Sequence, residues 1–334
     1  MAKINRQFRI AARPVGMVKT SDFRYAEEPV RTLQDGEVLV RTTHLSLDPS
    51  MRGQMENRAD YVAPLAIGDV MRAGGVGVID ESRHPDWAVG TLVGGTLGMQ
   101  TYLVSNGSSA PLRRYARGTD PVAALGVFGG TGMTAYFGML DIGRPVAGNT
   151  VVVSGAAGAT GSIAGQIARL KGCRVIGIAG SAAKCRWLTE ELGFDAAINY
   201  RDGAVASELD RLCPTGIDVY FDNVGGEILD HCLARLAMNA RVVLCGGISR
   251  YNAPGPVPGP INYFNLVFRR ARMEGFIVLD YAKRFDDAAR EMRLWIDAGA
   301  LKHKATVIDG FENLPRALMR LFEGDNTGKM MVKV

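Results

Sequence analysis

The stretch Thr150-Val-Val-Val-Ser154-Gly155-Ala156-Ala157-Gly158-Ala159-Thr160-Gly161 decides the fold of this chain. Its first residues are β-branched, which is typical of a strand. The three glycines allow a tight turn, close approach of a pyrophosphate and close helix–strand packing. Residues 162–170 carry apolar side chains at helical spacing, and a helix that starts here would offer free N–H groups to phosphate. The spacing is G-x-x-G-x-x-G rather than G-x-G-x-x-G, so a tight turn without a ligand remains the alternative.

Alternating strand and helix patterns follow this turn. Short apolar runs predict strands over residues 174–178, 196–199, 218–222, 241–245 and 273–278. Helical spacing predicts helices over residues 182–192, 226–236 and 282–298. This alternation indicates a doubly wound parallel sheet with helices on both faces, over residues 126–302.

The two flanking segments have a different pattern. Residues 1–125 contain short β-like runs at 8–12, 37–42, 74–79 and 91–93, separated by turn residues. Residues 303–334 contain short strands around one helix, at 314–323. We therefore expect an α/β protein in which residues 1–125 and 303–334 form one β-rich domain. The nucleotide-binding domain, residues 126–302, is inserted into it.

Composition excludes several classes of protein. The chain has 334 residues and a net charge of +5, with its basic residues dispersed, so neither RNA nor another nucleic acid is an expected partner. The uncharged stretches 121–140 and 149–168 are rich in glycine and favour soluble α/β segments over membrane spans. No apolar leader follows the first residues, so no signal peptide is expected. Five cysteines without a C-x-x-C motif favour a reduced, cytoplasmic protein.

The end of the second strand of the inserted domain indicates which nucleotide binds. Its sequence is Ile178-Ala179-Gly180-Ser181-Ala182-Ala183-Lys184, without the acidic residue that an NAD site needs for the ribose hydroxyls. Ser181 can donate to a 2′-phosphate, and Lys184 can neutralise it. Lysine is rare here, with none between Lys19 and Lys171. NADP(H) is therefore favoured over NAD(H), although a solvated lysine is the alternative.

A metal site is not expected. Residues 1–125 contain no cysteine, and their only histidines are His44 and His84. A tetrahedral zinc site needs several such ligands at short spacing. We predict that His44 is a packed or hydrogen-bonded structural residue. The same scarcity argues against a Cys/His nucleophile, and the five cysteines are predicted to be small buried core residues.

Further motifs along nearly the whole chain resemble the zinc-independent medium-chain dehydrogenase/reductase superfamily. Within it, the chain is most similar to leukotriene/prostaglandin reductases, plant double-bond reductases and bacterial NADPH-dependent curcumin reductases. The matching segments are Leu45-Ser-Leu-Asp-Pro-Ser-Met-Arg52, Gly132-Met-Thr-Ala-Tyr-Phe-Gly138, Ala156-Ala-Gly-Ala-Thr-Gly161, Gly172-Cys-Arg-Val-Ile-Gly177, Leu192-Gly-Phe-Asp195, Asn199-Tyr200, Tyr220-Phe-Asp-Asn-Val-Gly-Gly226, Cys245-Gly-Gly-Ile-Ser249, Arg272-Met-Glu-Gly-Phe276 and Gly328-Lys329.

This resemblance implies a GroES-like β-rich domain plus a Rossmann domain, and a homodimer joined through the last Rossmann strand. It also implies NADPH-dependent reduction of the C=C bond in α,β-unsaturated ketones or aldehydes. The cofactor-binding positions that it implies, beside Ser181, are the phosphate turn Gly158, Ala159, Thr160 and Gly161; Lys184 and Tyr200 at the adenosine 2′-phosphate; Asn223 at the nicotinamide ribose; Cys245, Gly246, Ser249 and Tyr251 along the cofactor; Phe276, Ile277 and Val278 at the nicotinamide; and Asn326, reaching back from the C-terminal segment.

The hydroxyl donor that would stabilise an enolate is the open point. Family members often place a tyrosine five residues before the Met of the R-M-E motif, but here that residue is Phe268. We predict Tyr263 or Tyr61 as the replacement, with the cofactor ribose hydroxyl as another donor. Either tyrosine could instead be only a wall of the pocket that binds a small hydrophobic enone.

Two other functions fit the same sequence. One is an NADPH quinone oxidoreductase, which shares the fold and cofactor. The other is a catalytically idle nucleotide-sensing protein, which the missing tyrosine at position 268 keeps open. The segment 251–260 holds four prolines and predicts a stiff irregular loop that orders over the cofactor.

Overall fold

The computed structural model describes residues 3–57, 62–107 and 111–334. The chain divides into two compact units. Unit 1 comprises Met1–Leu125 together with Ala305–Val334, and unit 2 comprises Gly126–Lys304. Within the described residues, none of the helices combines the length and the apolar character that crossing a membrane requires.

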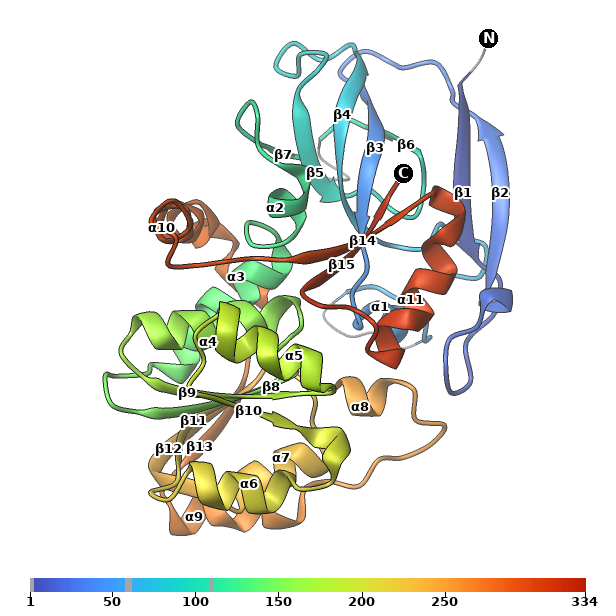
Figure 1. The fold of residues 1–334 in the computed structure, drawn as a ribbon. Coiled ribbons are helices and arrows are strands. Elements are labelled where there is room, and N and C mark those ends of the chain that lie inside the picture. The colour runs from blue at the N-terminus through green and yellow to red at the C-terminus, as the bar shows by residue number, and fades with distance from the viewer. Residues whose placement is uncertain (1–2, 58–61, 108–110) are drawn as a thin grey trace. The chain divides into compact units, whose positions relative to one another are not determined.

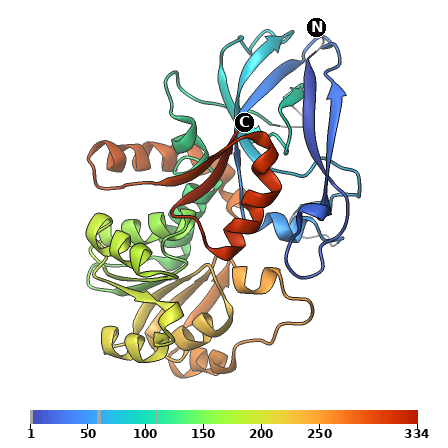
Figure 2. The same cartoon turned by 45° about the vertical axis from the view of Figure 1, so that its right-hand side comes forward.

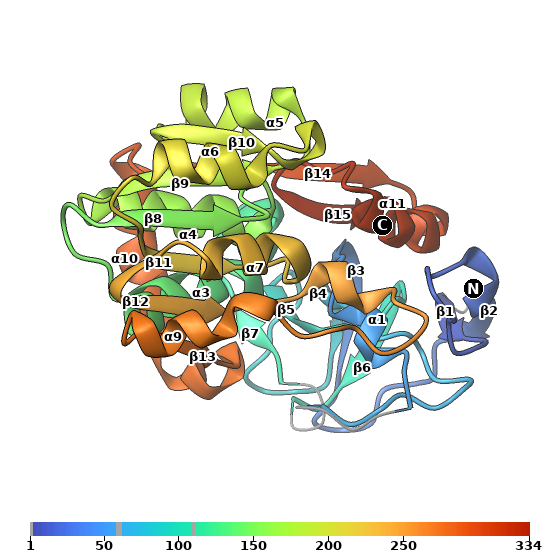
Figure 3. The same cartoon turned by 90° about the horizontal axis from the view of Figure 1, so that it is seen from below.

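Unit 2 is built on a six-stranded sheet whose paired strands all run parallel. Figure 3 shows the strands side by side in the order β10-β9-β8-β11-β12-β13. Numbered along unit 2, this is the order 3-2-1-4-5-6 of a doubly wound dinucleotide-binding sheet. The strands are β8 (Thr150–Ser154), β9 (Arg174–Ala179), β10 (Ala196–Asn199), β11 (Ile217–Asp222), β12 (Leu236–Leu244) and β13 (Arg272–Gly275).

Helices cover both faces of this sheet. Figure 1 shows α4 (Ala159–Leu170) and α5 (Ala182–Arg186) on one face. The other face carries α6 (Val205–Leu212), α7 (Gly226–Leu233) and α9 (Asn265–Phe268). On that second face Ile176 and Tyr220 of the sheet share a core with Leu209 of α6 and Leu233 of α7. The predicted α/β class and the doubly wound parallel sheet are confirmed.

Several boundaries in unit 2 differ from the expectations. The helix expected over 226–236 ends at Leu233, because the chain must turn before β12 begins at Leu236. The helix expected over 182–192 changes at Trp187 from α5 to a wider π-helical turn (Trp187–Glu191). The last strand stops at Gly275, before the expected residue 278.

Other helices of unit 2 were not expected or begin later than expected. α3 (Gly130–Phe137) and α6 were not predicted, and α10 (Phe285–Asp297) starts three residues late. α3 contains glycines, which disfavour a helix. A methyl group at Gly132 would lie 1.8 Å from the Val127 carbonyl oxygen, so close packing requires a glycine there.

Unit 1 is β-rich, as expected. Strands β1 (Ile4–Ile10) and β2 (Phe23–Pro29) form an antiparallel pair, of which β2 was not predicted. A seven-stranded sheet runs in the order β14-β15-β3-β4-β5-β7, with β6 paired to β3. Its strands are β3 (Val38–Ser46), β4 (Gly74–Ser82), β5 (Leu92–Thr96), β6 (Tyr102–Ser105), β7 (Arg113–Arg114), β14 (Ala305–Asp309) and β15 (Lys329–Lys333).

The described residues of unit 1 also form the α-helices α1 (Met51–Gln54), α2 (Pro121–Leu125) and α11 (Leu314–Glu323). Figure 2 shows α11 as the red helix beside the red strands β14 and β15. Its buried residues Leu314 and Leu318 share the core that contains Phe8 and Ile10 of β1. The C-terminal segment is therefore part of this core.

A buried lysine joins the two sequence segments of unit 1. Lys329 is 3% exposed, and its Nζ donates to the Leu47 carbonyl (2.6 Å) and to Asp48 Oδ1 (2.9 Å). The Leu47 N–H donates to the Met330 carbonyl at 3.1 Å. Two motifs around Asp48 and Lys329, which lie 281 residues apart in the sequence, thus meet at one contact.

Candidate dinucleotide-binding site

Nearly all the predicted cofactor residues of unit 2 lie at one edge of the sheet. Because the six strands are parallel, their carboxyl ends share this edge. The segments that follow these ends are Gly158–Gly161 after β8, Ser181–Lys184 after β9, Tyr200 after β10, Asn223 after β11, Cys245–Tyr251 after β12 and Phe276–Val278 after β13. Strand order thus brings together residues that are up to 120 positions apart in the sequence.

The centre of this edge is the switch point of the sheet. From β8 the chain passes to β9 on one side, and from β11 it passes to β12 on the other. The connections that follow β8 and β11 therefore run in opposite directions along the sheet. Ligands of doubly wound sheets bind in the crevice that this divergence leaves between the two strand ends. Ser154 ends β8 and Asp222 ends β11, so these residues flank the switch point.

The glycine turn after β8 has the shape of a phosphate cradle. Gly155 adopts a φ of 56°, which disfavours residues with a side chain. A methyl group at Gly161 would lie 2.4 Å from the Gly155 carbonyl oxygen, so this glycine serves close packing. Gly158 has an ordinary extended backbone and is the N-cap of α4, but it has no side chain to cap the helix. The first N–H groups of α4 thus fit an anion such as a pyrophosphate.

The residues after β9 and β10 lie next to each other. Ser181 is the N-cap of α5, and its Oγ accepts from the Lys184 backbone N–H at 3.3 Å. The Ser181 hydroxyl hydrogen can still be donated. The Tyr200 ring lies over Gly180, where an added methyl group would be 2.8 Å from the ring. A hydroxyl, an amine and a phenol therefore flank one strand end, which suits a phosphate monoester.

Asn223 is held in one orientation by the end of β8. Its Nδ2 donates to the Ser154 carbonyl oxygen at 2.7 Å, and its backbone N–H donates to Ser154 Oγ at 2.9 Å. Because the partner of Nδ2 is a carbonyl, the amide oxygen Oδ1 must point the other way. No hydrogen bond within unit 2, whose residues are all described, reaches this Oδ1. Asn223 thus presents an acceptor that suits a ribose hydroxyl.

The segment after β12 packs on the turn after β11. The Ser249 hydroxyl donates to the Val224 carbonyl at 2.6 Å, and the Gly247 N–H donates to the Tyr251 hydroxyl at 3.1 Å. Tyr251 ends the short helix α8 (Ile248–Tyr251), so the irregular loop begins one residue later than expected. Burial and the nearby Asp222 carboxylate raise the pKa of the Cys245 thiol to about 12. This cysteine is a neutral thiol near pH 7 and not a nucleophile.

After β13, the ring of Phe276 is packed, and the chain continues through Ile277 and Val278. The Phe276 ring lies over Gly138, where an added methyl group would be 2.6 Å from the ring. Tyr281 meets the same ring edge-on, with centroids 6.3 Å apart. The ring therefore packs inside unit 2. The backbone of Ile277 and Val278 continues past the strand end.

Three predicted residues are not placed at this edge. Tyr263 is 56% exposed and lies in a 3-10 turn. The neighbouring Asn262 donates hydrogen bonds from its backbone and its side chain to the carboxylate of Asp230, in the second half of α7. Asn326 belongs to unit 1, where it is buried and its Nδ2 donates to the Gly328 carbonyl at 2.7 Å. Tyr61 lies outside the described residues. Phe268, at the position of the expected tyrosine, is 61% exposed.

The possible metal ligands are dispersed. Within residues 3–57, 62–107 and 111–334, no three His, Cys, Asp or Glu side chains form a group that could hold a metal ion. His44 is half-buried on β3, and its Nδ1 lies 3.2 Å from Thr43 Oγ1. Burial lowers the pKa of His44, as does the nearby Lys333. His44 is thus a packed, hydrogen-bonded residue.

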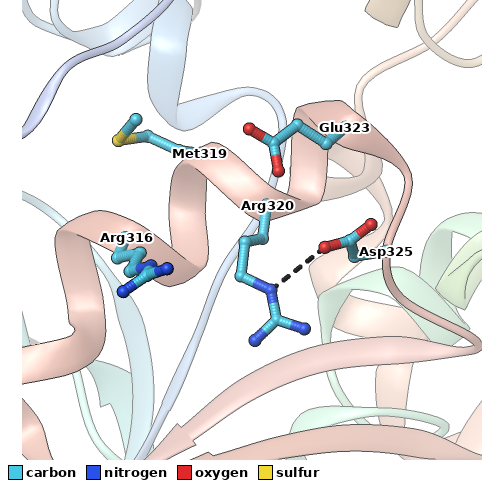
Figure 4. Close-up of a pocket in the computed structure, with 5 residues that line it drawn as sticks. All are labelled: Arg316, Met319, Arg320, Glu323 and Asp325. Carbon is cyan, nitrogen blue, oxygen red and sulfur yellow. Dashed lines mark hydrogen bonds and ion pairs between the residues drawn. The ribbon is translucent and has the colours of Figure 1, made fainter.

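Two surface pockets lie apart from the predicted residues. One, of about 420 Å³, is in unit 1 and is lined by Arg316, Met319, Arg320, Glu323 and Asp325 of α11 and the following loop (Figure 4). The other, of about 390 Å³, is in unit 2 and is lined by Trp187, Glu191, Leu192, Ile296, Leu301, Lys302, His303 and Lys304. Neither contains a residue of the strand ends.

Ser154 and Asp222 are site residues that the sequence reasoning missed. Both are buried polar residues at strand ends, and they contact each other across the switch point. An acidic residue at the end of an otherwise apolar strand, as in Tyr220-Phe-Asp222, is the signal that could have identified Asp222.

The sheet order, the glycine turn and the strand-end residues define a dinucleotide-binding oxidoreductase fold. A family model described as an N-terminal domain of oxidoreductase matches residues 6–111. A second model, described as a zinc-binding dehydrogenase, matches residues 159–293.

Known proteins match the whole chain. It is 42% identical over 335 residues to the NADPH-dependent curcumin reductase of Escherichia coli, covering 99% of this chain and 97% of that protein. It is 39% identical to prostaglandin reductase 1 of Bos taurus, covering 96% of each. The crystal structure of CurA from Vibrio vulnificus in complex with NADPH matches with a TM-score of 0.94 and 41% identity, covering 98% of this chain and 99% of that one. The chain belongs to the zinc-independent medium-chain dehydrogenase/reductase family, in the subgroup of the curcumin and prostaglandin reductases.

Proposed function

We propose that this protein reduces the C=C bond of α,β-unsaturated ketones and aldehydes, with NADPH as the reductant. Relatives that match nearly the full length at 39% and 42% identity support an NADPH-dependent oxidoreductase of the curcumin and prostaglandin reductase type. A relative at 41% identity has been solved with NADPH, so the predicted cofactor is confirmed. The observation that carries the proposal is the collection of every strand-end segment of unit 2 at one sheet edge.

The residues at this edge fit the cofactor group by group. Gly158 leaves space at the start of α4, whose first N–H groups would bind the pyrophosphate. Ser181, Lys184 and Tyr200 would hold the adenosine 2′-phosphate. Asn223 Oδ1 would accept from a ribose hydroxyl. The remaining contacts from unit 2 would come from Cys245, Gly246, Ser249, Tyr251, Phe276, Ile277 and Val278.

The chemistry needs a donor that stabilises negative charge on the substrate oxygen. NADPH, when bound, supplies the hydride that adds to the β-carbon of the enone. A hydroxyl group of the protein would donate a hydrogen bond to the carbonyl oxygen as charge develops there, which contributes about 3 kcal/mol. Tyr263 and Tyr61 are the proposed donors. The exposed position of Tyr263 on its helical turn makes a pocket-wall role the competing assignment.

A substrate panel tests the proposal. We expect a linear enone to consume NADPH and to yield a product two hydrogens heavier at the C=C bond, with NADH a poor substitute. Turnover of quinones without enone reduction would instead identify a quinone oxidoreductase. Binding of NADPH without hydride transfer to any substrate would identify an idle nucleotide-sensing protein.

Tyrosine variants identify the donor. Loss of the donating hydroxyl should lower kcat by about 100-fold. We therefore expect either Tyr263→Phe or Tyr61→Phe, but not both, to lower kcat on that scale with an unchanged KM for NADPH. Full activity in both variants would assign the donation to the ribose hydroxyl.

A homodimer and a cytoplasmic location belong to the same proposal. β13 is an edge strand, and an exposed edge needs pairing or protection. The helical turns that lead into it expose Ile261 (85%), Phe264 (54%), Val267 (60%) and Phe268 (61%), which is an unusual apolar cluster for a free surface. All five cysteines are unpaired, which suits a reducing compartment. We assign residues 1–125 and 303–334 as the GroES-like domain and residues 126–302 as the NADP-binding domain.

A further inference from the structure

The buried carboxylate of Asp222 is the most densely hydrogen-bonded group at the switch point. Asp222 is 1% exposed. Its Oδ1 accepts from Tyr220 Oη (2.7 Å), Ser154 Oγ (2.9 Å), Gly225 N (2.9 Å) and Val224 N (3.0 Å). A buried carboxylate costs free energy unless hydrogen bonds replace its lost water, and these four donors do so. One oxygen atom thus holds the end of β8, its own strand and the turn that starts α7.

The backbone of Asp222 adds a third strand end. Its carbonyl oxygen accepts from the Cys245 and Gly246 N–H groups, both at 3.0 Å. These residues follow β12 and are among the predicted cofactor contacts. Through its side chain and backbone, Asp222 therefore fixes the relative positions of the ends of β8, β11 and β12.

The link from Asp222 to the cofactor contact runs through one hydroxyl group. Ser154 has a single hydroxyl hydrogen, which it donates to Asp222. Its oxygen lone pairs are thereby directed at the Asn223 backbone N–H, 2.9 Å away. The Ser154 carbonyl holds Asn223 Nδ2 at 2.7 Å, which leaves Oδ1 as the outward acceptor. The Ser154 hydroxyl, whose proton position Asp222 sets, thus holds the Asn223 backbone, and the carbonyl of the same serine orients the Asn223 amide.

We propose that Asp222 is a positioning residue for the cofactor, which acts through Ser154 to hold the Asn223 amide oxygen toward the ribose. This inference rests on the proposed NADPH binding, and it assigns no contact between Asp222 and the cofactor or substrate. A purely structural role would stabilise the sheet without affecting how Asn223 binds. The two roles differ in whether Asp222 and Asn223 are energetically coupled in cofactor binding.

A double-mutant cycle on NADPH binding measures this coupling. The variants are Asp222→Asn, Asn223→Ala and their combination, with NADPH Kd measured by fluorescence titration and the melting temperature measured without cofactor. We expect each single variant to raise Kd by about tenfold. We expect the combined variant to bind like Asn223→Ala alone, because Asp222 acts through that side chain.

A second carboxylate on the same strand provides the matched control. Asp218 Oδ2 accepts from the Thr150 N–H at 2.8 Å and so ties β11 to β8 at their amino ends. Asp218→Asn should lower the melting temperature and leave the NADPH Kd unchanged. If Asp222→Asn does not fold, Ser154→Ala replaces it in the cycle, and its combination with Asn223→Ala should again bind NADPH like Asn223→Ala alone.

The inference is overturned if Asp222→Asn melts earlier but binds NADPH as the unmodified protein does. It is also overturned if the effects of Asp222→Asn and Asn223→Ala on Kd multiply as those of independent sites do. Failure of the unmodified protein to bind NADPH would instead reject the proposed function. The two failures are therefore distinguishable in one titration series.

Discussion

Lys184 is the residue whose proposed role predicts a choice between the two nicotinamide cofactors. It lies in the first turn of α5, after the end of β9, where no acidic residue would bind a free ribose hydroxyl. A hydrogen bond to a charged group contributes about 1.5–3 kcal/mol, so Lys184→Ala should raise the KM for NADPH by about 10- to 100-fold. KM for NADH should change little, because NADH has no 2′-phosphate. Initial rates with each cofactor measure this.

Arg186→Ala is the control for this prediction. Arg186 is a cation in the same short helix, and its side chain is exposed. It should leave both Michaelis constants unchanged. An equal loss with NADPH and NADH in Lys184→Ala would refute a role at the 2′-phosphate.

Two glycines of one turn should respond differently to the same substitution. At Gly158 the backbone is extended, and an added methyl group would have a single close neighbour, the Gly155 carbonyl oxygen at 3.1 Å. Gly158→Ala should therefore fold with nearly the original melting temperature and bind NADPH at least tenfold more weakly, because the methyl group fills the pyrophosphate position. Thermal melting and NADPH titration together measure the two effects.

Gly161→Ala should show the opposite pattern. Its methyl group would lie 2.4 Å from the Gly155 carbonyl oxygen and 2.9 Å from Ala156 Cα, so the turn itself must move. Overpacking of this kind costs about 1–3 kcal/mol of stability. An unchanged melting temperature in Gly161→Ala would contradict the assignment of this glycine to helix–strand packing.

Single residues could be predicted from the sequence where their role is local. The glycine turn and Lys184 each occupy a fixed position after one strand, and a short motif reveals them. Asp222 shows in the sequence as an acidic residue that ends an apolar strand, but its contact with Ser154 does not, because that partner lies 68 residues away. Closeness in sequence to position 268 favours Tyr263 as the hydroxyl donor. It carries no information about which part of α7 the turn of Tyr263 contacts.

At the scale of elements, the loop that follows α8 is expected to respond to the cofactor. Residues 253–260 form neither helix nor strand, and they follow the segment that packs on the turn after β11. We expect hydrogen exchange in this loop to slow when NADPH and an enone are added, because ordering protects its amides. The comparison is with α6, where exchange should be unchanged. Equal exchange in the loop with and without ligands would contradict the prediction.

Elements were predictable where one pattern dominated. The central strands β8, β9 and β11 of unit 2 are short and almost entirely buried, so their apolar runs appear plainly in the sequence. α3 was missed because its glycines, which fit close neighbours, lower its helix propensity. The change from α5 to a π-helical turn at Trp187 was missed because a single wider turn within a helical segment is too short to alter the apolar periodicity recognisably.

At the scale of the whole molecule, the sequence of β13 suits pairing with a second copy. Arg272 and Glu274 are two residues apart on this edge strand and therefore lie on one side, with their charged groups 3.9 Å apart. A two-fold antiparallel pairing centred on Met273 would set Arg272 of each copy opposite Glu274 of the other. Glu274→Arg should then weaken the dimer, and the exchange Arg272→Glu with Glu274→Arg should restore it.

Light scattering after gel filtration measures this prediction. The control is Glu208→Arg in the helix α6, a surface substitution outside β13 that should not affect the molar mass. A monomeric unmodified protein would reject the dimer. A double variant that dissociates as readily as Glu274→Arg would reject this register.

The buried thiols predict how stability depends on pH. Burial is the main cause that raises the pKa of Cys173 and Cys213 to about 11 and that of Cys245 to about 12, from an ordinary value of 9.0. Above pH 9 the unfolded chain loses these protons while the folded chain keeps them. The free energy of unfolding should therefore fall as pH rises from about 9 towards 12. Urea midpoints at pH 8 and 10.5, under reducing conditions, measure the fall.

A cysteine variant separates this cause from others. Cys213→Ala removes one of the titrating groups, so its loss of stability between the two pH values should be smaller than that of the unmodified protein. An identical loss would assign the pH dependence to other groups, such as the Lys3 amine, whose pKa ion pairing with Asp80 and Glu81 raises to about 12.

The contact between Lys329 and Asp48 has a consequence for the order of events during synthesis. Unit 2 is continuous in sequence, so all its strands have been made once residue 304 leaves the ribosome. Unit 1 must wait for β14 and β15, because β15 pairs with β3 and Lys329 closes onto the loop after it. The half that is translated first is thus completed last. Until then the end of β3 at residues 44–46, where β15 pairs, is open, and we expect nascent chains stalled before residue 305 to be the form most prone to aggregation.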